Sequence, residues 1–404
     1  MHSTTVCIIG GGPAGIMLGF LLARSGIAVT VLEKHADFFR DFRGDTIHPS
    51  TLELLHELGL LEKFLSLPHS EVDRLSGIIG DHKVTMANFS HLPTRAKFIA
   101  LMPQWDFLNF LSTEAAQFPT FTLRMGWEAT DLIRQNGITT GVRANTPEGP
   151  VEIPATLTVG CDGRHATSRA AAHLPLIDVG VPIDVLWLQI ARQPSDPENA
   201  LGYVNYGRLI VLINRNDYFQ CGYIIAKGAF DQIQHAGLPA FRQSLERIVP
   251  FLSGRTGEID SWDKVKLLTV QVNRLQRWSS PGLLCIGDAA HAMSPVGGIG
   301  INVALQDAVA AANILAEPLR SNTLTPHDLQ HVQHYRETAV RRTQAFQVFA
   351  HGILDRVLRN PGPVNPPLLF RAITSFPGFQ YLMARFIGMG LQPQHIRTPP
   401  APAI

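Results

Sequence analysis

Cysteine and net charge are scarce in this sequence, and its apolar C-terminal region is broken by charges. The 404 residues include 4 cysteines, no Cys-x-x-Cys pair, 17% charged residues and a formal net charge of +1. These values argue against a disulfide-stabilised secreted fold and against bulk attraction to nucleic acid. The longest uncharged run between Leu368 and Leu391, Ala372 to Ala384, has 13 residues and is too short to span a bilayer. We expect a cytoplasmic globular protein with reduced cysteines, no signal peptide and no transmembrane segment.

The N-terminus fits a strand, a glycine-rich turn and a helix. Thr4 to Ile9 is typical of a buried parallel strand, and Pro13 to Arg24 carries apolar residues at helical spacing. Between the two, Gly10, Gly12 and Gly15 form a Gly-x-Gly-x-x-Gly turn that also contains Ala14. Such a turn lets the backbone approach a pyrophosphate, which the unpaired N–H groups of the helix N-terminus attract. This segment therefore predicts a dinucleotide site.

An acidic residue ends the next expected strand, Ala28 to Leu32. Glu33 stands 18 residues after Gly15 and can accept hydrogen bonds from an adenosine ribose. The neighbouring Lys34 is a further candidate cofactor contact. No arginine adjoins Glu33 to receive a 2′-phosphate, which favours an unphosphorylated adenosine end.

A second motif follows the apolar strand Leu283 to Ile286. It reads Gly287-Asp288-Ala289-Ala290-His291, and a glycine-rich helix start follows at Gly297 to Gly300. A carboxylate at a strand end can accept hydrogen bonds from ribityl hydroxyls, and a helix N-terminus stabilises negative charge on a reduced ring. Two binding motifs far apart in the sequence, the Gly10 to Gly15 turn and the Gly287 to His291 segment, would contact the two ends of one long ligand, which favours FAD. No second dinucleotide fingerprint is present, so NADH or NADPH would have to reach the flavin transiently.

Periodicity predicts the remaining organisation. Antiparallel strands are expected at Val185–Ile190, Leu209–Ile213 and Tyr218–Ile225, and helices at Thr51–Leu65, Trp105–Gln117 and Asp328–Leu358. The apolar stretch Leu368 to Leu391 is expected to be a lid or a core helix pair, with membrane association as the alternative.

The fold class predicted from these segments is α/β. A Rossmann-like FAD-binding domain would comprise residues 1–173 and 273–320. An inserted antiparallel β-sheet domain for substrate would occupy residues 174–272. Residues 321–404 would form a helical C-terminal region with a disordered tail from Thr398 to Ile404.

Several motifs, taken in order, carry a resemblance to a known family. They are Gly10 to Gly15, Arg43-Gly44, Pro103-Gln104, Gly160-Cys161-Asp162-Gly163, and Gly287 to His291 followed by Pro295 and Gly300-Ile301-Asn302. With this order and spacing, the chain resembles the single-component FAD-dependent aromatic hydroxylases, the para-hydroxybenzoate hydroxylase-like group A flavoprotein monooxygenases. The resemblance covers roughly residues 4–345.

The resemblance implies a role for each matched residue. Gly12 and Gly15 would approach the pyrophosphate, and Glu33 would hold the ribose. The phosphate–ribityl side would be contacted by Arg43, Gln104 and Asp288. Candidate contacts with the rest of the cofactor are Gly10, Ala14, Asp162, Gly298 and the backbone N–H groups of Gly300 and Ile301, and the backbone of Pro295 is a candidate for catalysis.

Two positions depart from the family pattern. A serine usually stands three residues after the glycine of the Asp162-Gly163 segment, and here that residue is Ala166, although the arginine three residues later is present as Arg169. The choice between NADH and NADPH therefore stays open. The common Gly-Gln-Gly is Gly298-Ile299-Gly300, which keeps the backbone contacts and loses a side-chain amide.

Some single residues are candidates for chemistry and for substrate binding. His48 could be a base that deprotonates a phenol, and the alternative is a helix-entry histidine that bonds locally before Pro49. Candidate substrate contacts on the predicted strands are Trp187, Gln189, Phe219 and Tyr223, although half of such a set faces the far side of a sheet. No metal site is expected.

The resemblance implies an FAD-dependent monooxygenase that consumes NADH or NADPH and dioxygen. It would hydroxylate an aromatic or electron-rich apolar small molecule through a flavin hydroperoxide, in a dry pocket, with FAD bound non-covalently. Two alternatives stay open: a flavin-dependent reductase or dehydrogenase of the same fold, and a non-catalytic flavin-loaded binding protein. We expect no nucleic-acid partner, and a monomer or homodimer.

Overall fold

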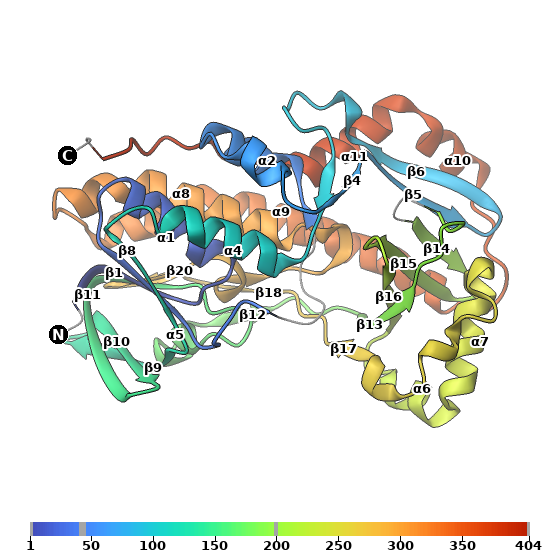
Figure 1. Ribbon diagram of the computed structural model, residues 1–404, viewed down its shortest axis with the longest axis horizontal. Helices are drawn as coiled ribbons and strands as arrows, with labels where there is room; N and C mark the ends of the chain where they lie inside the picture. The colour runs from blue at the N-terminus through green and yellow to red at the C-terminus, as the bar shows by residue number, and fades with distance from the viewer. Residues whose placement is uncertain (1–2, 40–45, 198–200, 402–404) are drawn as a thin grey trace.

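The computed structural model describes residues 3–39, 46–197 and 201–401, which form two large β-sheets connected by long helices (Figure 1). The candidate contact Arg43 lies outside the described residues. The α/β class predicted from the sequence is confirmed.

The first sheet has eight strands. Its main path runs β19 (Ser279–Ser280), β20 (Leu283–Cys285), β11 (Gly149–Gly160), β1 (Thr4–Ile9), β2 (Val29–Glu33) and β8 (Phe121–Met125), and β10 (Ile138–Thr146) and β9 (Glu128–Gln135) extend from β11. The pairs β1–β2, β1–β11, β11–β20 and β2–β8 are parallel. Parallel pairing brings the carboxyl ends of these strands to one edge, where α/β proteins bind nucleotides.

Helices cover one face of this sheet. Helix α1 (Pro13–Arg24) begins with a proline at its first position and ends before Gly26, which has a φ of +81°. It packs with α4 (Gln104–Ala115) and α8 (Gly300–Arg320) around a core that includes Ile16 and Leu305. The opposite face is covered by the β9–β10 hairpin and α5 (Thr167–Ala171).

The second sheet has the order β17 (Lys266–Leu268), β13 (Ile183–Ala191), β16 (Tyr218–Ala226), β15 (Arg208–Asn214), β14 (Leu201–Asn205), β5 (Arg74–Ile79) and β6 (His82–Asn88). The three strands expected in its middle are present. Strands β5 and β6 come from residues 74–88, far before the expected inserted segment, and join through the parallel pair β5–β14. One face of the sheet is covered by α6 (Phe230–Ala236) and α7 (Leu238–Ile248).

The C-terminal region is helical, as expected. Helix α9 (Pro326–Leu358) begins with a capping box between Thr325 and Asp328. It is followed by α10 (Leu368–Ser375) and α11 (Pro377–Met389), which lie beside β6 in Figure 1. One helical stretch, Val296–Arg320, is long and apolar enough to cross a membrane by length and composition, but 78% of its apolar window is buried inside the protein.

Short elements complete the described chain. The smaller strands are β3 (Thr46–Ile47), β4 (Ser70–Val72), β7 (Ile99–Leu101), β12 (Leu176–Asp178), β18 (Asn273–Leu275) and β21 (His291–Ala292). The short helices are α2 (Pro49–Glu57), α3 (Leu61–Leu65), η1 (Phe89–His91), η2 (Pro250–Leu252), η3 (Thr256–Glu258), η4 (Trp262–Lys264), η5 (Gly287–Ala289) and η6 (Val296–Gly298).

Two local predictions were wrong. The single helix expected over Thr51–Leu65 is the pair α2 and α3, because Gly59 adopts a φ of +73° that ends the first helix. The tail expected to be disordered begins at Thr398, and its described residues, Thr398 to Ala401, lie against the end of α1. The carbonyl groups of Thr398 and Pro399 accept hydrogen bonds from the side chains of Arg24 and Ser25 at the C-terminal end of α1.

Candidate functional site: a dinucleotide cradle at the sheet edge

The carboxyl edge of the first sheet brings four sequence motifs together. The turn after β1 starts at Gly10, and β2 ends at Glu33. Strand β11 leads to Asp162, and β20 leads to Asp288. The contact between the first and third motifs is direct, because a Cβ added to Gly10 would lie 2.4 Å from the Cys161 carbonyl oxygen. The motifs thus share one continuous edge although about 280 residues separate the first from the last.

The glycine turn has the geometry of a phosphate cradle. A Cβ on Gly15 would lie 2.0 Å from the Gly10 carbonyl oxygen, so only glycine fits there. A Cβ on Gly12 would meet nothing within 4 Å, which places open space above the turn. Gly12 is also the N-cap of α1 and provides no side-chain cap. The first N–H groups of α1 are thus available to an anion such as a pyrophosphate.

Glu33 is fixed beside this turn. Its Oε2 atom accepts the Gly11 N–H at 3.0 Å, and its Oε1 atom accepts the His35 N–H at 3.1 Å. The Glu33 side chain is buried, and the adjacent Lys34 is exposed. The carboxylate is therefore oriented at the strand end, where a ribose hydroxyl could donate to it.

Asp162 accepts hydrogen bonds from a residue in the first turn of α5. Its two carboxylate oxygens accept the Ser168 N–H at 2.9 Å and the Ser168 hydroxyl at 2.6 Å. Burial raises the pKa of Asp162, although these hydrogen bonds from Ser168 and the charge of Arg169 oppose the rise. Ser168, two residues after Ala166, thus holds the Asp162 carboxylate, a contact that sequence reasoning overlooked.

Asp288 keeps a partly exposed carboxylate at the edge. Its Oδ2 atom lies 3.2 Å from Arg164 Nε, and no described residue is hydrogen-bonded to its Oδ1 atom. A free, oriented carboxylate oxygen at this place fits a ribityl hydroxyl. Arg164 was not predicted as a site residue, and the only sequence signal for it was its place two residues after Asp162. Gln104, at the first turn of α4, makes no contact with these residues that would test its predicted role.

The loop before α8 provides a second set of N–H groups. Gly297 and Gly298 have φ values of +83° and +64°, and a Cβ on Gly298 would lie 2.5 Å from Thr46 Oγ1. Pro295 precedes them as the N-cap of η6, and Gly300 and Ile301 open α8. Ile299 gives α8 no side-chain cap, so the first N–H groups of this helix are also available to a negatively charged ring edge.

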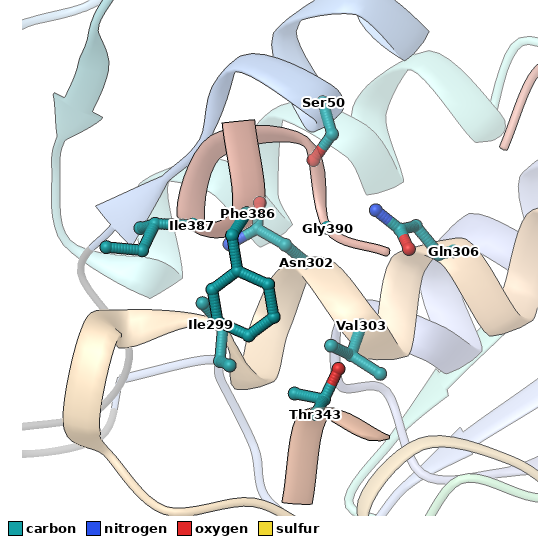
Figure 2. Close-up of a pocket in the computed structure, with 9 residues that line it drawn as sticks. All are labelled: Ser50, Ile299, Asn302, Val303, Gln306, Thr343, Phe386, Ile387 and Gly390. Atoms are coloured by element: carbon teal, nitrogen blue, oxygen red, sulfur yellow. The ribbon is translucent and has the colours of Figure 1, made fainter. Parts of the chain in front are cut away.

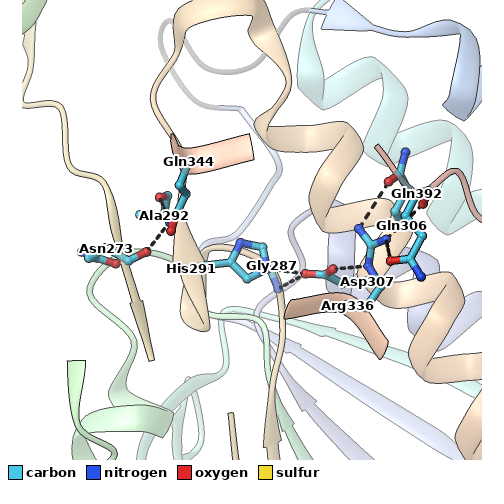
Figure 3. Close-up of polar contacts among 9 residues, drawn as sticks. All are labelled: Asn273, Gly287, His291, Ala292, Gln306, Asp307, Arg336, Gln344 and Gln392. Atoms are coloured by element: carbon cyan, nitrogen blue, oxygen red, sulfur yellow. Dashed lines mark hydrogen bonds and ion pairs between the residues drawn. The ribbon is translucent and has the colours of Figure 1, made fainter. Parts of the chain in front are cut away.

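A buried ion network holds the Asp288 turn in place (Figure 3). Asp307 accepts the Gly287 N–H at 3.2 Å and lies 2.6 Å from His291 Nε2. Its other oxygen accepts Arg336 Nε at 2.9 Å. Burial disfavours the Asp307 charge, but His291 and Arg336 outweigh this effect and hold the pKa of Asp307 below its usual range.

The same network reaches the C-terminal segment. Arg336 donates to the Gln392 carbonyl oxygen at 3.1 Å and to Gln306 Oε1 at 3.3 Å, and its side chain is only 1% exposed. His291 is the last residue of the motif that contains Asp288. Its bond to Asp307 shows that it positions the motif, and sequence reasoning missed both Asp307 and Arg336.

His48 has the contacts of a helix-entry residue. It is the N-cap of α2, its N–H donates to Asn302 Oδ1 at 3.1 Å, and its Nδ1 lies 2.8 Å from the Ile387 carbonyl oxygen. Because a carbonyl only accepts, Nδ1 carries the proton. Burial lowers the pKa of His48 to about 4. These contacts favour the structural alternative, and a role as base stays a prediction.

The four candidate substrate residues divide between the two faces of the second sheet. Phe219 and Tyr223 face α7, where the Tyr223 hydroxyl lies 3.1 Å from Ser244 Oγ and Phe219 packs against Phe251. Side chains alternate along a strand, so such a division was expected, and contact of any of the four residues with substrate stays a prediction. Trp187 and Gln189 lie on the other face, where Trp187 packs in one cluster with Val296 from the loop before α8.

A small cavity lies near this loop (Figure 2). Its volume is about 10 Å³, enough for one water molecule and far too small for an aromatic substrate. It is lined by Ser50, Ile299, Asn302, Val303, Gln306, Thr343, Phe386, Ile387 and Gly390. It is therefore a small gap in the packing of α2, α8, α9 and α11 and not a substrate site.

His327 and His331 are four residues apart on α9, a spacing used in metal sites. Among residues 3–39, 46–197 and 201–401, no group of three or more His, Cys, Asp or Glu side chains could hold a metal ion.

The comparison with protein families decides the identity of the cradle. The family described as FAD binding domain matches residues 3–345. The chain belongs to this family. It is thus an FAD-dependent monooxygenase of the aromatic hydroxylase family that its motifs resemble, and FAD is its cofactor.

Individual relatives show how far the similarity extends along the chain. The chain is 28% identical to 6-methylpretetramide 4-monooxygenase of Streptomyces rimosus over 397 residues, which cover 98% of this chain and 94% of that protein. It is also 28% identical to dialkyldecalin synthase of Streptomyces rugosporus over 76% of this chain and 64% of the relative's length. The solved p-nitrophenol 4-monooxygenase of Pseudomonas putida DLL-E4 shares the fold, with a TM-score of 0.78 at 16% identity over 97% of this chain and all of that one.

Proposed function

We propose that the protein hydroxylates an aromatic or electron-rich apolar small molecule, using NADH or NADPH and dioxygen. Bound FAD would supply the redox chemistry, accepting a hydride and activating oxygen. The chain's own residues would bind the cofactor, place the substrate and exclude water. Gly12, Glu33 and Asp288 are proposed to hold the dinucleotide, with Gln104 and Arg43 as further contacts carried by the family resemblance.

One observation carries the choice of substrate class. The sheet face opposite α7 is apolar, and Leu209, Val211 and Trp187 belong to one cluster with Val296 of the loop before α8 and with two leucines of α9, Leu354 and Leu358. If the N–H groups of Gly300 and Ile301 receive the ring edge, the substrate lies between the ring and this apolar face. An apolar wall favours a flat, apolar molecule and keeps water away from the reacting atoms.

Trp187 supplies a specific contact for such a substrate. Its indole lies over Gly222, where a Cβ would be 3.1 Å from the ring. Its Nε1 atom is buried and has no hydrogen-bond partner among the described residues. A buried donor without a partner is costly, so a substrate oxygen that accepts this N–H would be favoured. We therefore propose a substrate with a carbonyl or phenolic oxygen beside its apolar rings.

The experiment is a screen of aromatic compounds for stimulated NADH and NADPH oxidation by the FAD-loaded protein. Compounds with several fused rings and oxygen substituents should stimulate oxidation most. The Trp187→Phe variant should raise KM for the best compound at least threefold by loss of one neutral hydrogen bond of about 1 kcal/mol. Tyr223→Phe, on the other face, is the matched control and should leave KM unchanged. If no compound of the panel stimulates oxidation, the hydroxylase assignment loses its support.

Similarity to dialkyldecalin synthase favours one second candidate. That relative is named as a synthase and not as an oxygenase. A flavin-loaded protein that holds an apolar molecule and promotes its rearrangement would have the same cradle and wall. Such a protein would convert substrate without consuming NADH, NADPH or dioxygen, so the same screen separates the two functions.

A further inference from the structure

An apolar strip is exposed on the outer side of α10 and α11. Leu369 and Ile373 stand on successive turns of α10, and Phe376 follows directly after the last residue of this helix. Their exposed fractions are 72%, 43% and 65%. Leu382 on α11 is 64% exposed. Apolar residues four positions apart share one helix face, so Leu369 and Ile373 form a line on α10, and Phe376 comes next in the link between α10 and α11. Single exposed leucines are common, but a row of this kind marks a contact surface.

The strip is held in place by the fold. Phe376 lies over Gly378, where a Cβ would be 2.6 Å from the Phe376 ring, so the strip continues from α10 onto α11. The other side of α11 is buried through Ala384 and Ile387 in a cluster with Phe89. The preceding linker is also fixed, since the Val364 N–H donates to Asn205 Oδ1 at 2.9 Å. The exposed side chains are therefore presented outward by a packed platform.

Cations lie on the side of α10 that faces β6. A polar cavity of about 210 Å³ lies between β6 and α10, and His82, Lys83 and Arg371 are among the residues that line it. Neither Lys83 nor Arg371 forms an ion pair with a residue that the structure describes. The sequence from Asn360 to Ile404 contains no aspartate or glutamate. The formal net charge of the whole chain is +1, but the region around α10 and α11 is locally basic. Asp81, in the turn between β5 and β6, is an acidic residue two positions before Lys83.

We propose that this α10–α11 surface docks on an anionic phospholipid bilayer. The four apolar side chains would enter the boundary between headgroups and acyl chains, and Lys83 and Arg371 would face lipid phosphates. A second copy of the chain fits less well, because a symmetric contact through this surface would bring the same unpaired cations together. No membrane-spanning helix is required. The proposal does not depend on the reaction, although an apolar substrate dissolved in a bilayer would be within reach of such a protein.

The test is co-sedimentation of the FAD-loaded protein with vesicles. Vesicles of phosphatidylcholine with phosphatidylglycerol should bind it at least tenfold more tightly than phosphatidylcholine alone, and added salt should weaken the binding. The variants Leu369→Ser/Phe376→Ser and Lys83→Gln/Arg371→Gln should each lose at least tenfold in affinity. The double variant Lys266→Gln/Leu267→Ser changes an exposed cation and leucine on β17 and is the matched control, with affinity unchanged.

Several outcomes would overturn the proposal. One is vesicle binding that both strip variants retain, and another is equal loss in the β17 control. A third is a dimer in light scattering that Leu369→Ser/Phe376→Ser converts to a monomer without any vesicle binding by the parent protein, which would assign the surface to self-association. Bound FAD and the thermal unfolding midpoint of each variant establish that it is folded, so a loss of binding can be attributed to the surface.

Discussion

Arg164 and Asp288 form an ion pair at the carboxyl edge of the first sheet, with 3.2 Å between Arg164 Nε and Asp288 Oδ2. The two residues come from loops that follow different strands, β11 and β20, and both side chains are partly exposed. The pair leaves Asp288 Oδ1 available to a ligand. The pair therefore links the loop after β11 to the loop after β20. Arg164 lies outside the motifs recognised in the sequence.

The first prediction concerns the cradle carboxylates. Asp288→Ala should weaken FAD binding about ten- to a hundredfold, because a charge-assisted hydrogen bond contributes about 1.5–3 kcal/mol. Arg164→Gln should weaken it less, since it removes only the partner that orients Asp288. Asp162→Ala should have the smallest effect on FAD, because both oxygens of Asp162 bind Ser168. Titration of apoprotein with FAD measures all three, and an unchanged dissociation constant for Asp288→Ala would place that carboxylate away from the cofactor.

The open space above Gly12 gives a sharper test of the pyrophosphate site. Gly12→Ala should leave the thermal unfolding midpoint of the apoprotein unchanged, because the added Cβ meets nothing within 4 Å. It should weaken FAD binding at least tenfold, or about 1.4 kcal/mol, because the methyl group occupies the space that the phosphates need. Gly257→Ala is the control, as its Cβ would also meet open space, far from the cradle. Wild-type FAD affinity in Gly12→Ala would rule out the proposed pyrophosphate position.

His48 should make stability depend on pH in a defined window. Burial lowers its pKa from 6.5 to about 4, so the unfolded chain binds the proton more readily than the folded one. The stabilisation is complete above pH 6.5 and is lost as pH falls toward 4, with about 2 kcal/mol lost between pH 7 and 5. Urea unfolding of the wild type and His48→Gln at both pH values measures this, with the exposed His327→Gln as control. The same pH dependence in His48→Gln would exclude His48 as its source.

Arg336 should be essential for stability. Removing one partner of a buried ion pair leaves an uncompensated charge and costs about 3–5 kcal/mol, so Arg336→Ala should lower the free energy of unfolding by this amount at pH 7. Arg341→Ala changes an exposed arginine of the same helix and should shift it by less than about 0.5 kcal/mol. Asp307→Asn should also weaken FAD binding, because Asp307 fixes the Gly287 N–H beside Asp288. A loss below about 1 kcal/mol in Arg336→Ala would show that the network contributes little.

The parts of the site that could be predicted from sequence are those with a local signature. Gly10, Gly12, Gly15 and Glu33 follow from strand, turn and helix in immediate succession, and Asp288 follows from a strand end. Their convergence is a consequence of parallel pairing, which brings all carboxyl ends to one edge. Motif order was therefore sufficient for the cradle and for the fold class.

The remaining features depend on contacts between distant segments. Arg336 lies 45 residues after His291 and is identified only by its bond to Asp307. Phe219 and Tyr223 are aromatic residues of the kind that line substrate pockets. They are instead buried under α7, and the alternating pattern of a strand does not show which of its two faces a helix will cover. Strands β5 and β6 join the second sheet through β14, a pairing between segments more than 100 residues apart.

The most direct test of the central claim follows one atom of dioxygen. The FAD-loaded protein is incubated with NADH or NADPH, its best substrate from the screen and ¹⁸O₂, and the product is analysed by mass spectrometry. A monooxygenase places one labelled oxygen atom in the product and reduces the other to water, so a single ¹⁸O per hydroxylation is expected. Product that forms without the label, or that carries oxygen from labelled water, would contradict the account and leave a dehydrogenase or a non-redox conversion in its place.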